Sequence, residues 1–387
     1  MKQKTKSARH RCQSIAPSAP LGLGMVLAAL ALPLGNLAQA QAQAQPEYAQ
    51  IGFKYLGYQD SQPGQERIKV TAPAFSLMTP VGRQWSVAGN VVVDSISGAS
   101  PAYHTQALTS MVDERRAVDI ALTRYFEEGT ITLGGYFSQE ADYVSRGITL
   151  GGTYSTEDKN TTWNAGLNLS HDSINPSNRI TADETKDTQE ISLGVTQVLT
   201  QRDIMQAIAG FSHGVGYYSD PYKIFDKRPN QRDHTTFLLR WNHHIDATGG
   251  TSRLSYRYYK DSFDILAHTL TAEYVQHLPD GWTLTPQMRL YSQSAARFYV
   301  DFNPDWAPFP ANPPPGAQHY SEDQRLSAYG ARSMGIKVAK QLGEGWQVDL
   351  KYDSYTQKAE YKFGGGGSPY LDPLTMVTYQ VGVSKRF

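Results

Sequence analysis

The stretch Met376-Val-Thr-Tyr-Gln-Val-Gly-Val-Ser-Lys-Arg-Phe387 alternates apolar residues with small or polar ones and ends in phenylalanine. Successive side chains of a β-strand point to opposite faces, so this pattern predicts a strand with one apolar and one polar face. In an outer-membrane barrel the apolar face meets lipid and the polar face meets the lumen. We therefore expect the last strand of a barrel here, with a C-terminal assembly signal formed by Tyr379, Val381, Val383 and Phe387.

The beginning of the chain has the pattern of an export signal. Five basic residues between Lys2 and Arg11 precede an apolar stretch from Leu21 to Leu34, and Ala38-Gln39-Ala40 is a small-x-small cleavage sequence. The apolar stretch is too short for a spanning helix. We expect a signal peptide over residues 1–40 cleaved near Ala40, a disordered lead-in over 41–46, and one barrel domain over 47–387, located in the outer membrane of a Gram-negative bacterium.

Composition excludes several classes of function. The chain has 36 basic and 36 acidic residues, and without the five basic residues of the leader the balance is 31 to 36, which argues against nucleic-acid binding. The single cysteine, Cys12, lies in the leader, so the mature chain would have no disulfide, thiolate metal site or attached haem. The sequence therefore predicts no cofactor, and 24 Tyr with 33 Gly suit a barrel.

Period-two alternation between turn residues predicts strands along the whole mature chain. The fold class is an all-β transmembrane antiparallel β-barrel of about 16 strands (14–18), an even number as in bacterial single-chain barrels. The predicted strands are 48–59, 66–79, 84–96, 114–126, 130–139, 143–157, 161–171, 187–200, 203–217, 233–246, 251–260, 266–278, 281–294, 324–341, 345–358 and 376–387.

The predicted connections are alternately short and long. Turns such as Pro80-Val81-Gly82 and Pro279-Asp280-Gly281 alternate with mostly longer segments such as 172–186, 218–232 and 295–323. Outer-membrane barrels have short periplasmic turns and long extracellular loops. A soluble sandwich has no reason to keep this two-sided rule, so the connections favour a barrel with both termini in the periplasm.

The apolar phase of each strand also predicts which residues face the lumen. Strands 130–139 and 161–171 place small uncharged residues inward, whereas the later strands place charged ones there. A charge facing lipid at the membrane midplane would cost about 2–4 kcal/mol. The predicted charged lumen wall consists of Arg240, Arg253, Arg257, Glu273, Arg289, Lys337, Asp349 and Asp353.

This wall has two interpretations. Rings of charge set the selectivity of pores, so the arginines could select anionic solutes. Alternatively, Arg side chains pair with Glu273, Asp349 and Asp353 in a network that holds the wall together. The sequence leaves both open.

Two loops stand out. The segment 94–103 is compact and rich in turn residues and could fold inward as a constriction. The loop 295–323 holds a Pro313-Pro314-Pro315 run and unusually many aromatic residues for a solvated segment. We expect this loop to pack over or into the extracellular mouth as a lid, through Phe302, Trp306 and Phe309.

Metal binding and catalysis find little support. His104, His171, His213, His234 and His268 fall near strand ends or in loops, close in sequence to Asp94, Asp172 and Asp233. No pair has the spacing of a chelating motif, so we predict no metal site. Scattered Ser, His and Asp prove nothing, so we expect no enzyme.

Several short motifs in combination resemble one family. They are Asp94-Ser-Ile-Ser-Gly-Ala-Ser-Pro101, Glu140-Ala-Asp142-Tyr143, Tyr218-Ser-Asp220-Pro221, Arg228-Pro229, Tyr256-Arg257-Tyr258-Tyr259 and Tyr291-Ser-Gln293-Ser294. Together they resemble the domain-of-unknown-function 3570 family of Gram-negative outer-membrane β-barrel proteins, over nearly the whole mature chain. The resemblance implies the barrel and its compartment and supplies no catalytic residues.

Three functions follow as hypotheses. The first is a channel or transporter for small hydrophilic solutes, with anionic solutes as one option, because barrels of about 16 strands can leave an aqueous channel. The second is a scaffold or sleeve for a periplasmic or surface partner such as a redox protein. The third, a membrane-embedded enzyme, requires an acid and histidine cluster at the rim. The expected partners are outer-membrane lipid, the barrel-assembly machinery during insertion, and a small solute or an unknown protein, with no nucleic acid.

Overall fold

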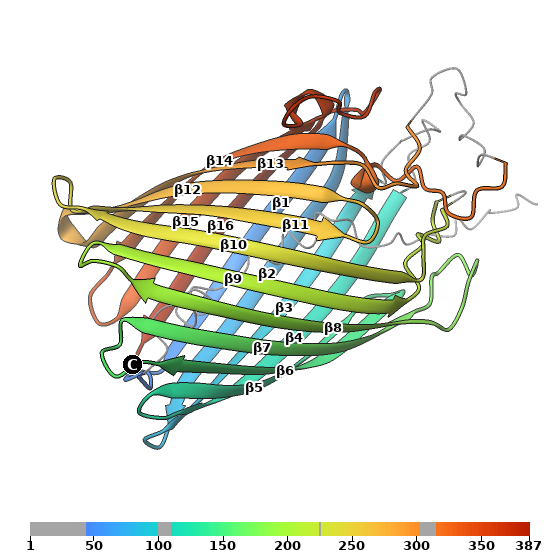
Figure 1. The fold of residues 1–387 in the computed structure, drawn as a ribbon. Helices are drawn as coiled ribbons and strands as arrows, with labels where there is room; N and C mark the ends of the chain where they lie inside the picture. Colours follow the sequence, from blue (N-terminus) through green and yellow to red (C-terminus); the bar gives the residue numbers. More distant parts are fainter. Residues whose placement is uncertain (1–43, 100–109, 224–225, 302–314) are drawn as a thin grey trace, which may run out of the picture.

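Sixteen antiparallel strands form one closed ring in the part of the chain that the computed structural model describes, residues 44–99, 110–223, 226–301 and 315–387. Each strand pairs with its neighbours in sequence, and β1 pairs with β16 to close the barrel (Figure 1). The strands are β1 (Gln50–Gln62), β2 (Gln65–Val81), β3 (Trp85–Ala99), β4 (Ser110–Tyr125), β5 (Gly129–Gln139), β6 (Tyr143–Ser155), β7 (Thr161–Ile174), β8 (Glu184–Val198), β9 (Asp203–Gly216), β10 (Gln231–Ile245), β11 (Gly250–Asp261), β12 (Leu266–Leu278), β13 (Trp282–Gln293), β14 (Tyr329–Gln341), β15 (Trp346–Lys358) and β16 (Leu374–Arg386).

The predicted barrel and its strand number are confirmed, and the strand ends differ by a few residues. The largest difference is at β14, which begins at Tyr329 and not at residue 324. Residues Gln324–Leu326 instead form a short 3-10 helix, η3, because the Asp323 side chain accepts a hydrogen bond from the backbone N–H of Arg325 and caps it. Two further 3-10 helices are η1 (Pro279–Gly281) and η4 (Ala359–Tyr361).

Alternation along the strands produces an apolar outer surface. Ile120, Leu133 and Ile148 are 60, 57 and 57% exposed, far more than apolar side chains in a soluble core. Because the barrel is closed, exposed residues of this phase lie on the face that meets lipid. Among the described residues, no helix is long and apolar enough to cross a membrane.

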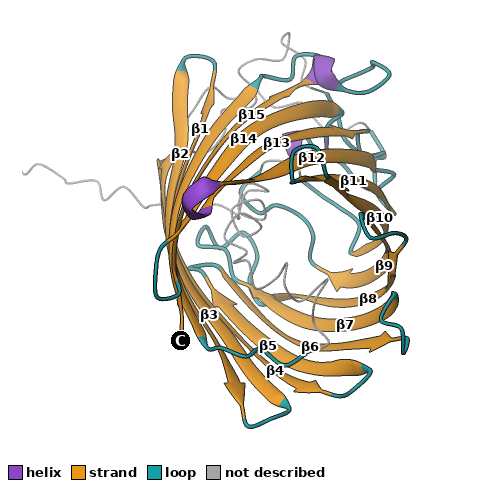
Figure 2. Ribbon diagram, turned by 90° about the vertical axis from the view of Figure 1, so that its left-hand side faces the viewer, coloured by secondary structure: helices purple, strands orange, loops and turns teal. Residues whose placement is uncertain are grey.

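The connections at the two ends of the barrel differ in length. At one end they are short: 82–84, 126–128, 156–160, 199–202, 246–249, 279–281 and 342–345. At the other end 175–183, 217–230, 294–328 and 359–373 are longer, whereas 63–64, 140–142 and 262–265 are short. By the rule for outer-membrane barrels the short-turn end is periplasmic and the long-loop end extracellular. In the view of Figure 2 the strands surround one central lumen.

Two short turns contain residues in the left-handed region of φ. Asp280 and Gly281 have φ of 59° and 76°, and Glu344 and Gly345 have φ of 59° and 79°. Two consecutive positive φ values match the right-handed twist of the flanking strands in tight hairpins. The Asp-Gly and Glu-Gly pairs therefore explain why these connections are so short.

Tryptophans form a girdle at the periplasmic end. Cations cover three of them: Arg124 lies 5.4 Å from the ring centroid of Trp85, Lys340 lies 4.7 Å from that of Trp282, and Lys385 lies 4.9 Å from that of Trp346. Trp163 and Trp241 are exposed on the same outer phase. Such aromatic belts sit at membrane interfaces.

The first and last described residues lie near this girdle. The signal peptide expected over 1–40 lies outside the described residues, and within the expected lead-in the Gln45 amide donates hydrogen bonds to the carbonyls of Gly82 (3.0 Å) and Trp85 (2.8 Å). In the C-terminal strand, Tyr379 and Val381 are exposed on the outer face. Val383 pairs with Phe53, and the Phe387 backbone N–H donates to the carbonyl of Ala49 at 3.0 Å.

Candidate functional site in the lumen

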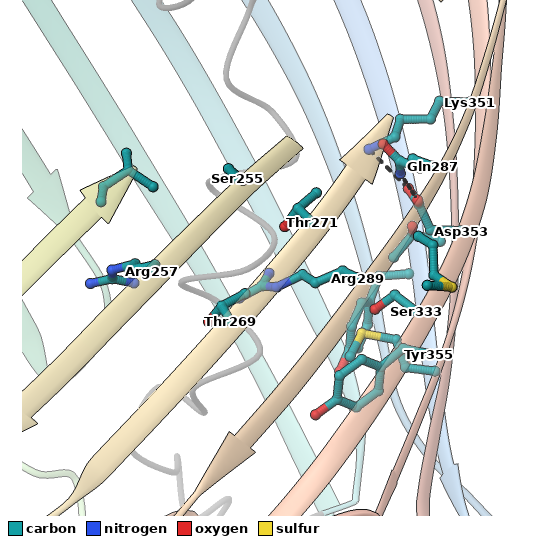
Figure 3. A pocket seen from close by; sticks show the side chains of 15 residues that line it. Ser255, Arg257, Thr269, Thr271, Gln287, Arg289, Ser333, Lys351, Asp353 and Tyr355 are labelled. Atoms are coloured by element: carbon teal, nitrogen blue, oxygen red, sulfur yellow. Dashed lines mark hydrogen bonds and ion pairs between the residues drawn. The ribbon is translucent and has the colours of Figure 1, made fainter. Parts of the chain in front are cut away.

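A cavity of about 360 Å³ lies inside the barrel, against the lumen face of β10 to β16 and β1. Its polar side chains extend from neighbouring strands, as Figure 3 shows. Three cations and one carboxylate are among its lining residues. The lining residues are Tyr58, Leu238, Ser255, Arg257, Thr269, Thr271, Gln287, Met288, Arg289, Ser333, Lys351, Asp353, Tyr355, Met376 and Thr378.

The structure brings the charged lumen wall to this side of the barrel. Arg257, Arg289 and Asp353 line the cavity itself. The remaining members lie an even number of residues from a lining residue on the same strand, which places them on the same face. These are Arg240 on β10, Arg253 on β11, Glu273 on β12, Lys337 on β14 and Asp349 on β15. The Arg240 guanidinium also donates to the Gln206 amide oxygen across the β9–β10 pair at 3.1 Å.

Every acidic member of the wall has a cation beside it. Arg253 lies directly opposite Glu273 in the strand register, with a nitrogen–oxygen distance of 3.9 Å. Lys337 and Asp349 are 3.7 Å apart, and Lys351 and Asp353 are 3.1 Å apart. The first two pairs join neighbouring strands and match the interpretation in which charges hold the wall together, whereas Lys351 and Asp353 pair within β15.

Arg257 and Arg289 differ from these pairs. They stand opposite Thr269 and Thr271 of β12, so threonine hydroxyls occupy the positions where carboxylates would neutralise them. Within the described residues neither guanidinium has an ion-pair or hydrogen-bond partner; Arg257 lies only near the Tyr259 ring, 6.0 Å from its centroid. The cavity therefore presents two uncompensated positive charges to whatever enters it.

Two glycines make room for the acids of the wall. Gly335 lies opposite Asp353, and a Cβ atom there would overlap the Asp353 carboxylate, which also accepts a hydrogen bond from the Gln287 amide. Gly382 lies opposite Asp349 in the same way. Sequence reasoning did not identify these glycines, because their effect depends on which residue stands across the pair.

The lumen also has an apolar strip that the sequence analysis missed. It runs over β1, β2, β14, β15 and β16, next to the cavity, and its members pack together and are buried. A signal was present: Phe53 and Tyr55 face lipid, so Leu56 and Tyr58 must face inward. The apolar strip consists of Leu56, Tyr58, Ile68, Val70, Ala72, Ala74, Ala331, Tyr355 and Met376.

Ion pairs join two loops at the extracellular end. Arg228 of the β9–β10 loop lies 2.9 Å from Asp226 and 2.7 Å from Asp323 of the β13–β14 loop. Arg325 contacts Asp323 and lies 2.6 Å from Asp220. We call Asp220, Asp226, Arg228, Asp323 and Arg325 the loop network.

The loop network is charged although it is buried. The Asp323 side chain is 0% exposed. Burial alone would raise the pKa of Asp323, but the nearby positive charges of Arg325, Lys223 and Arg228 outweigh it and hold that pKa well below its usual range. The network therefore fastens the β13–β14 loop to its neighbour in the ionised form.

The described flanks of the predicted lid pack on the neighbouring loop. Phe298 contacts Phe263 with ring centroids 4.9 Å apart, in a buried cluster that includes Ile265 and Leu326. Phe302, Trp306 and Phe309 lie outside the described residues, so the lid stays a prediction. Of the expected constriction segment 94–103, residues 100–103 also lie outside; Asp94 is buried and contacts Arg115.

The histidines that were considered as metal ligands do not come together. His171 lies 2.7 Å from Asp187, His213 lies 2.6 Å from Asp233, and His268 lies 2.8 Å from the Tyr256 hydroxyl, each on a different strand pair. His234 lies beside the Tyr259 ring, and His104 is outside the described residues.

In the described residues, one group of three acidic side chains comes close enough to share a cation, and it contains no histidine. Asp113, Glu140 and Asp142 are buried, with one oxygen from each within 4.8 Å of the others. The Tyr222 hydroxyl donates to Asp142 at 2.8 Å. Burial, together with Asp113, Asp142 and Asp94, outweighs the attraction of Arg115 and raises the pKa of Glu140 to about 7.

Among the solved structures that match, one with a TM-score above 0.5 supports the fold, and two others match less closely. A bacterial polysaccharide outer-membrane secretin matches with a TM-score of 0.52 and 8% identity, over 88% of this chain and 98% of that one. OccK9 (OpdG) of Pseudomonas aeruginosa has a TM-score of 0.43 and 11% identity, over 88% and 98% of the two chains. A FadL homologue of the same organism has a TM-score of 0.42 and 11% identity, over 88% and 90%. No curated protein matches the sequence.

Comparison with family models identifies the family. The model described as a protein of unknown function (DUF3570) matches residues 23–112 and 103–377, which is most of the chain. The motifs quoted from the sequence resemble the same family, so that resemblance is confirmed. The chain belongs to the DUF3570 family, with the fold of an outer-membrane β-barrel.

Proposed function

We propose that this barrel is a channel for small hydrophilic solutes and that it favours anions. The observation that carries the proposal is the pair Arg257 and Arg289, which line the lumen cavity and have no acidic partner in the described part of the chain. Charged groups lining a narrow pore set its selectivity, because the low-dielectric wall concentrates their field in the water-filled space.

The other groups of the cavity fit the same role. Ser255, Thr269, Thr271 and Ser333 offer hydroxyls that can donate to an anion or accept from a neutral solute. The carboxylate of Asp353 is balanced by Lys351 at 3.1 Å. A passing anion therefore meets two free guanidinium groups and several hydroxyls, and no uncompensated carboxylate, among the lining residues.

Two measurements on the purified barrel test the proposal. In planar bilayers we expect single-channel conductance, and in proteoliposome swelling assays we expect small anions to enter faster than cations of the same size. A well-assembled barrel that conducts but admits cations faster would contradict the anion preference. A barrel that assembles but does not conduct would contradict the channel.

A second role, a sleeve around a periplasmic or surface protein, is favoured by the apolar strip. Porin lumens are polar, whereas Tyr58, Tyr355 and Met376 of the apolar strip line the cavity, and Leu56, Ile68 and Val70 are buried beside them. The lining members suit an apolar segment of a partner. Absence of conductance in an assembled, heat-modifiable barrel would favour the sleeve over the channel.

A further inference from the structure

A second pocket, of about 390 Å³, lies on the outside of the barrel at the extracellular ends of β13 and β14. Its wall includes Met288, Leu290 and Met334, of which Met288 and Met334 are 41 and 65% exposed. These residues share the phase of Ile336, which faces lipid. The pocket therefore opens to the membrane, on the opposite face of the barrel wall from the lumen cavity, which Met288 also borders.

The loop after β15 covers the extracellular side of this pocket, and Figure 1 shows the segment in red beside β14. The backbone N–H of Phe363 donates to the Ser292 hydroxyl at 2.9 Å. The loop backbone passes so close to β14 that a Cβ atom at Gly330 would overlap the Tyr361 carbonyl. Residues 361–363 of the loop are thus fastened to the outer wall, while Ser368 and Leu371 further along contact Ala328 and Tyr329 at the mouth of the barrel.

Cations gather on this loop and beside it. The Arg332 guanidinium lies 4.0 Å from the centroid of the Tyr361 ring and the Lys358 ammonium lies 5.6 Å from it. The Lys362 ammonium donates to the Gly365 carbonyl at 2.7 Å, which leaves its charge uncompensated. Among the described residues none of the three forms an ion pair with a carboxylate, and the pocket lining has one acid, Glu360.

An apolar wall below three cations matches one class of ligand. Long apolar chains gain free energy on Met and Leu surface, while a phosphate at the membrane surface gains charge-assisted hydrogen bonds from Arg and Lys. Basic clusters at the membrane surface recognise anionic lipid headgroups in this way. The position at the extracellular end places the pocket in the outer leaflet.

We propose that this pocket binds a phosphorylated, acylated lipid of the outer leaflet. The acyl chain lies along Met288, Leu290 and Met334, and the phosphate contacts Arg332, Lys358 and Lys362. Glycolipids of the lipid A type combine these two parts. The site is independent of the lumen and of the channel proposed above.

Native mass spectrometry of the detergent-solubilised barrel with diphosphoryl lipid A tests this assignment. The triple variant R332Q/K358Q/K362Q should bind this lipid between about tenfold and a hundredfold more weakly than the wild type. The matched control is K260Q, which removes an exposed cation of β11 from outside the pocket and should leave affinity unchanged. M288S/M334S tests the apolar wall while it keeps every charge, and should also weaken binding.

Each other outcome overturns the proposal. Equal affinity of the triple variant and the wild type would show that the cations do not hold the phosphate. An equal loss of affinity in K260Q would show that binding depends on the general positive charge of the surface. Full competition by inorganic phosphate would indicate a plain anion site, and stronger binding of phosphatidylglycerol would indicate a phospholipid site. Heat modifiability on gels verifies that each variant is assembled.

Discussion

The loop network at the extracellular end and the pair Arg257 and Arg289 in the lumen, which have no acidic partner among the described residues, hold positive charge in opposite ways. In the loop network, Arg228 and Arg325 are mostly buried and each contacts two carboxylates. In the lumen, Arg257 and Arg289 face threonines across the strand pairs and line a cavity.

The difference follows from the surroundings. A buried ion loses its hydration, so it persists only where opposite charges replace the water. An arginine beside a water-filled cavity keeps its hydration and needs no partner. Pairing therefore identifies charges that hold structure together, and an unpaired charge in a cavity is available to a solute.

The largest expected effect is the loss of the loop network. The variant D323N removes the carboxylate charge that Arg228 and Arg325 share. The free energy that holds the β13–β14 loop in place should fall by about 3–5 kcal/mol, because both guanidinium groups keep less opposite charge beside them. The matched control is D264N, whose pair with Arg297 is 3.7 Å long and largely exposed. That pair should be worth at most about 1 kcal/mol. Hydrogen exchange over 315–328 compares the variants, and equal protection would contradict the structural role.

The same network should have a definite pH dependence. The folded pKa of Asp323 is depressed, so its contribution to stability is present above the unfolded value of about 3.9 and is lost as the pH falls through the lower, folded value. Proteolysis of the β13–β14 loop should therefore accelerate in acid in the wild type. D323N should lack this acid-dependent step; an unchanged acid step in D323N would assign it to other groups.

A smaller loss of stability is expected when a glycine beside the charged lumen wall is replaced by a larger residue. G335A inserts a methyl group against the Asp353 carboxylate, and overpacking of this kind costs about 1–3 kcal/mol. G343A, in a turn where a Cβ atom would have no neighbour within 4 Å, is the control. Urea unfolding in lipid vesicles gives the free energy of unfolding of each variant. A cost for G335A no greater than for G343A would show that Gly335 is not required for the position of Asp353.

The acidic cluster should respond to pH in the opposite direction to the loop network. The folded pKa of Glu140 is raised to about 7, so its stabilising contribution is present below the unfolded value of about 4.3 and is lost as the pH rises through about 7. Hydrogen exchange in the connection 140–142 should therefore accelerate between these values. E140Q mimics the protonated form and should make exchange insensitive to this change, and a persisting pH effect would exclude Glu140 as its source.

The sequence was sufficient for the barrel and its faces but not for the pairing of its charges. Alternation shows that Arg253 and Arg257 face the same way, because a strand shifted by one residue would send both into lipid. A shift of two residues keeps every face and changes every partner. Only the register of the structure places Glu273 opposite Arg253 and Thr269 opposite Arg257.

The loop network was beyond sequence reasoning for a different reason. Its contacts join Arg228 to Asp323 and Arg325 to Asp220, residues 95 and 105 positions apart. These residues lie in irregular loops, where no periodicity fixes the neighbours. By contrast, the apolar strip was accessible, since the inward phase of β1 and β2 follows from the same alternation that gave the outer face.

The most direct test of the central claim is the reversal potential of the reconstituted barrel in a KCl gradient. R257Q/R289Q should lower the preference for chloride over potassium by about thirtyfold at low salt, since each of the two unit charges, about 8 Å from an ion, attracts chloride and repels potassium by about 0.5 kcal/mol in water. R253Q/E273Q removes a compensated pair and should leave the preference unchanged. An unchanged reversal potential in R257Q/R289Q, or an equal shift in R253Q/E273Q, would contradict the account.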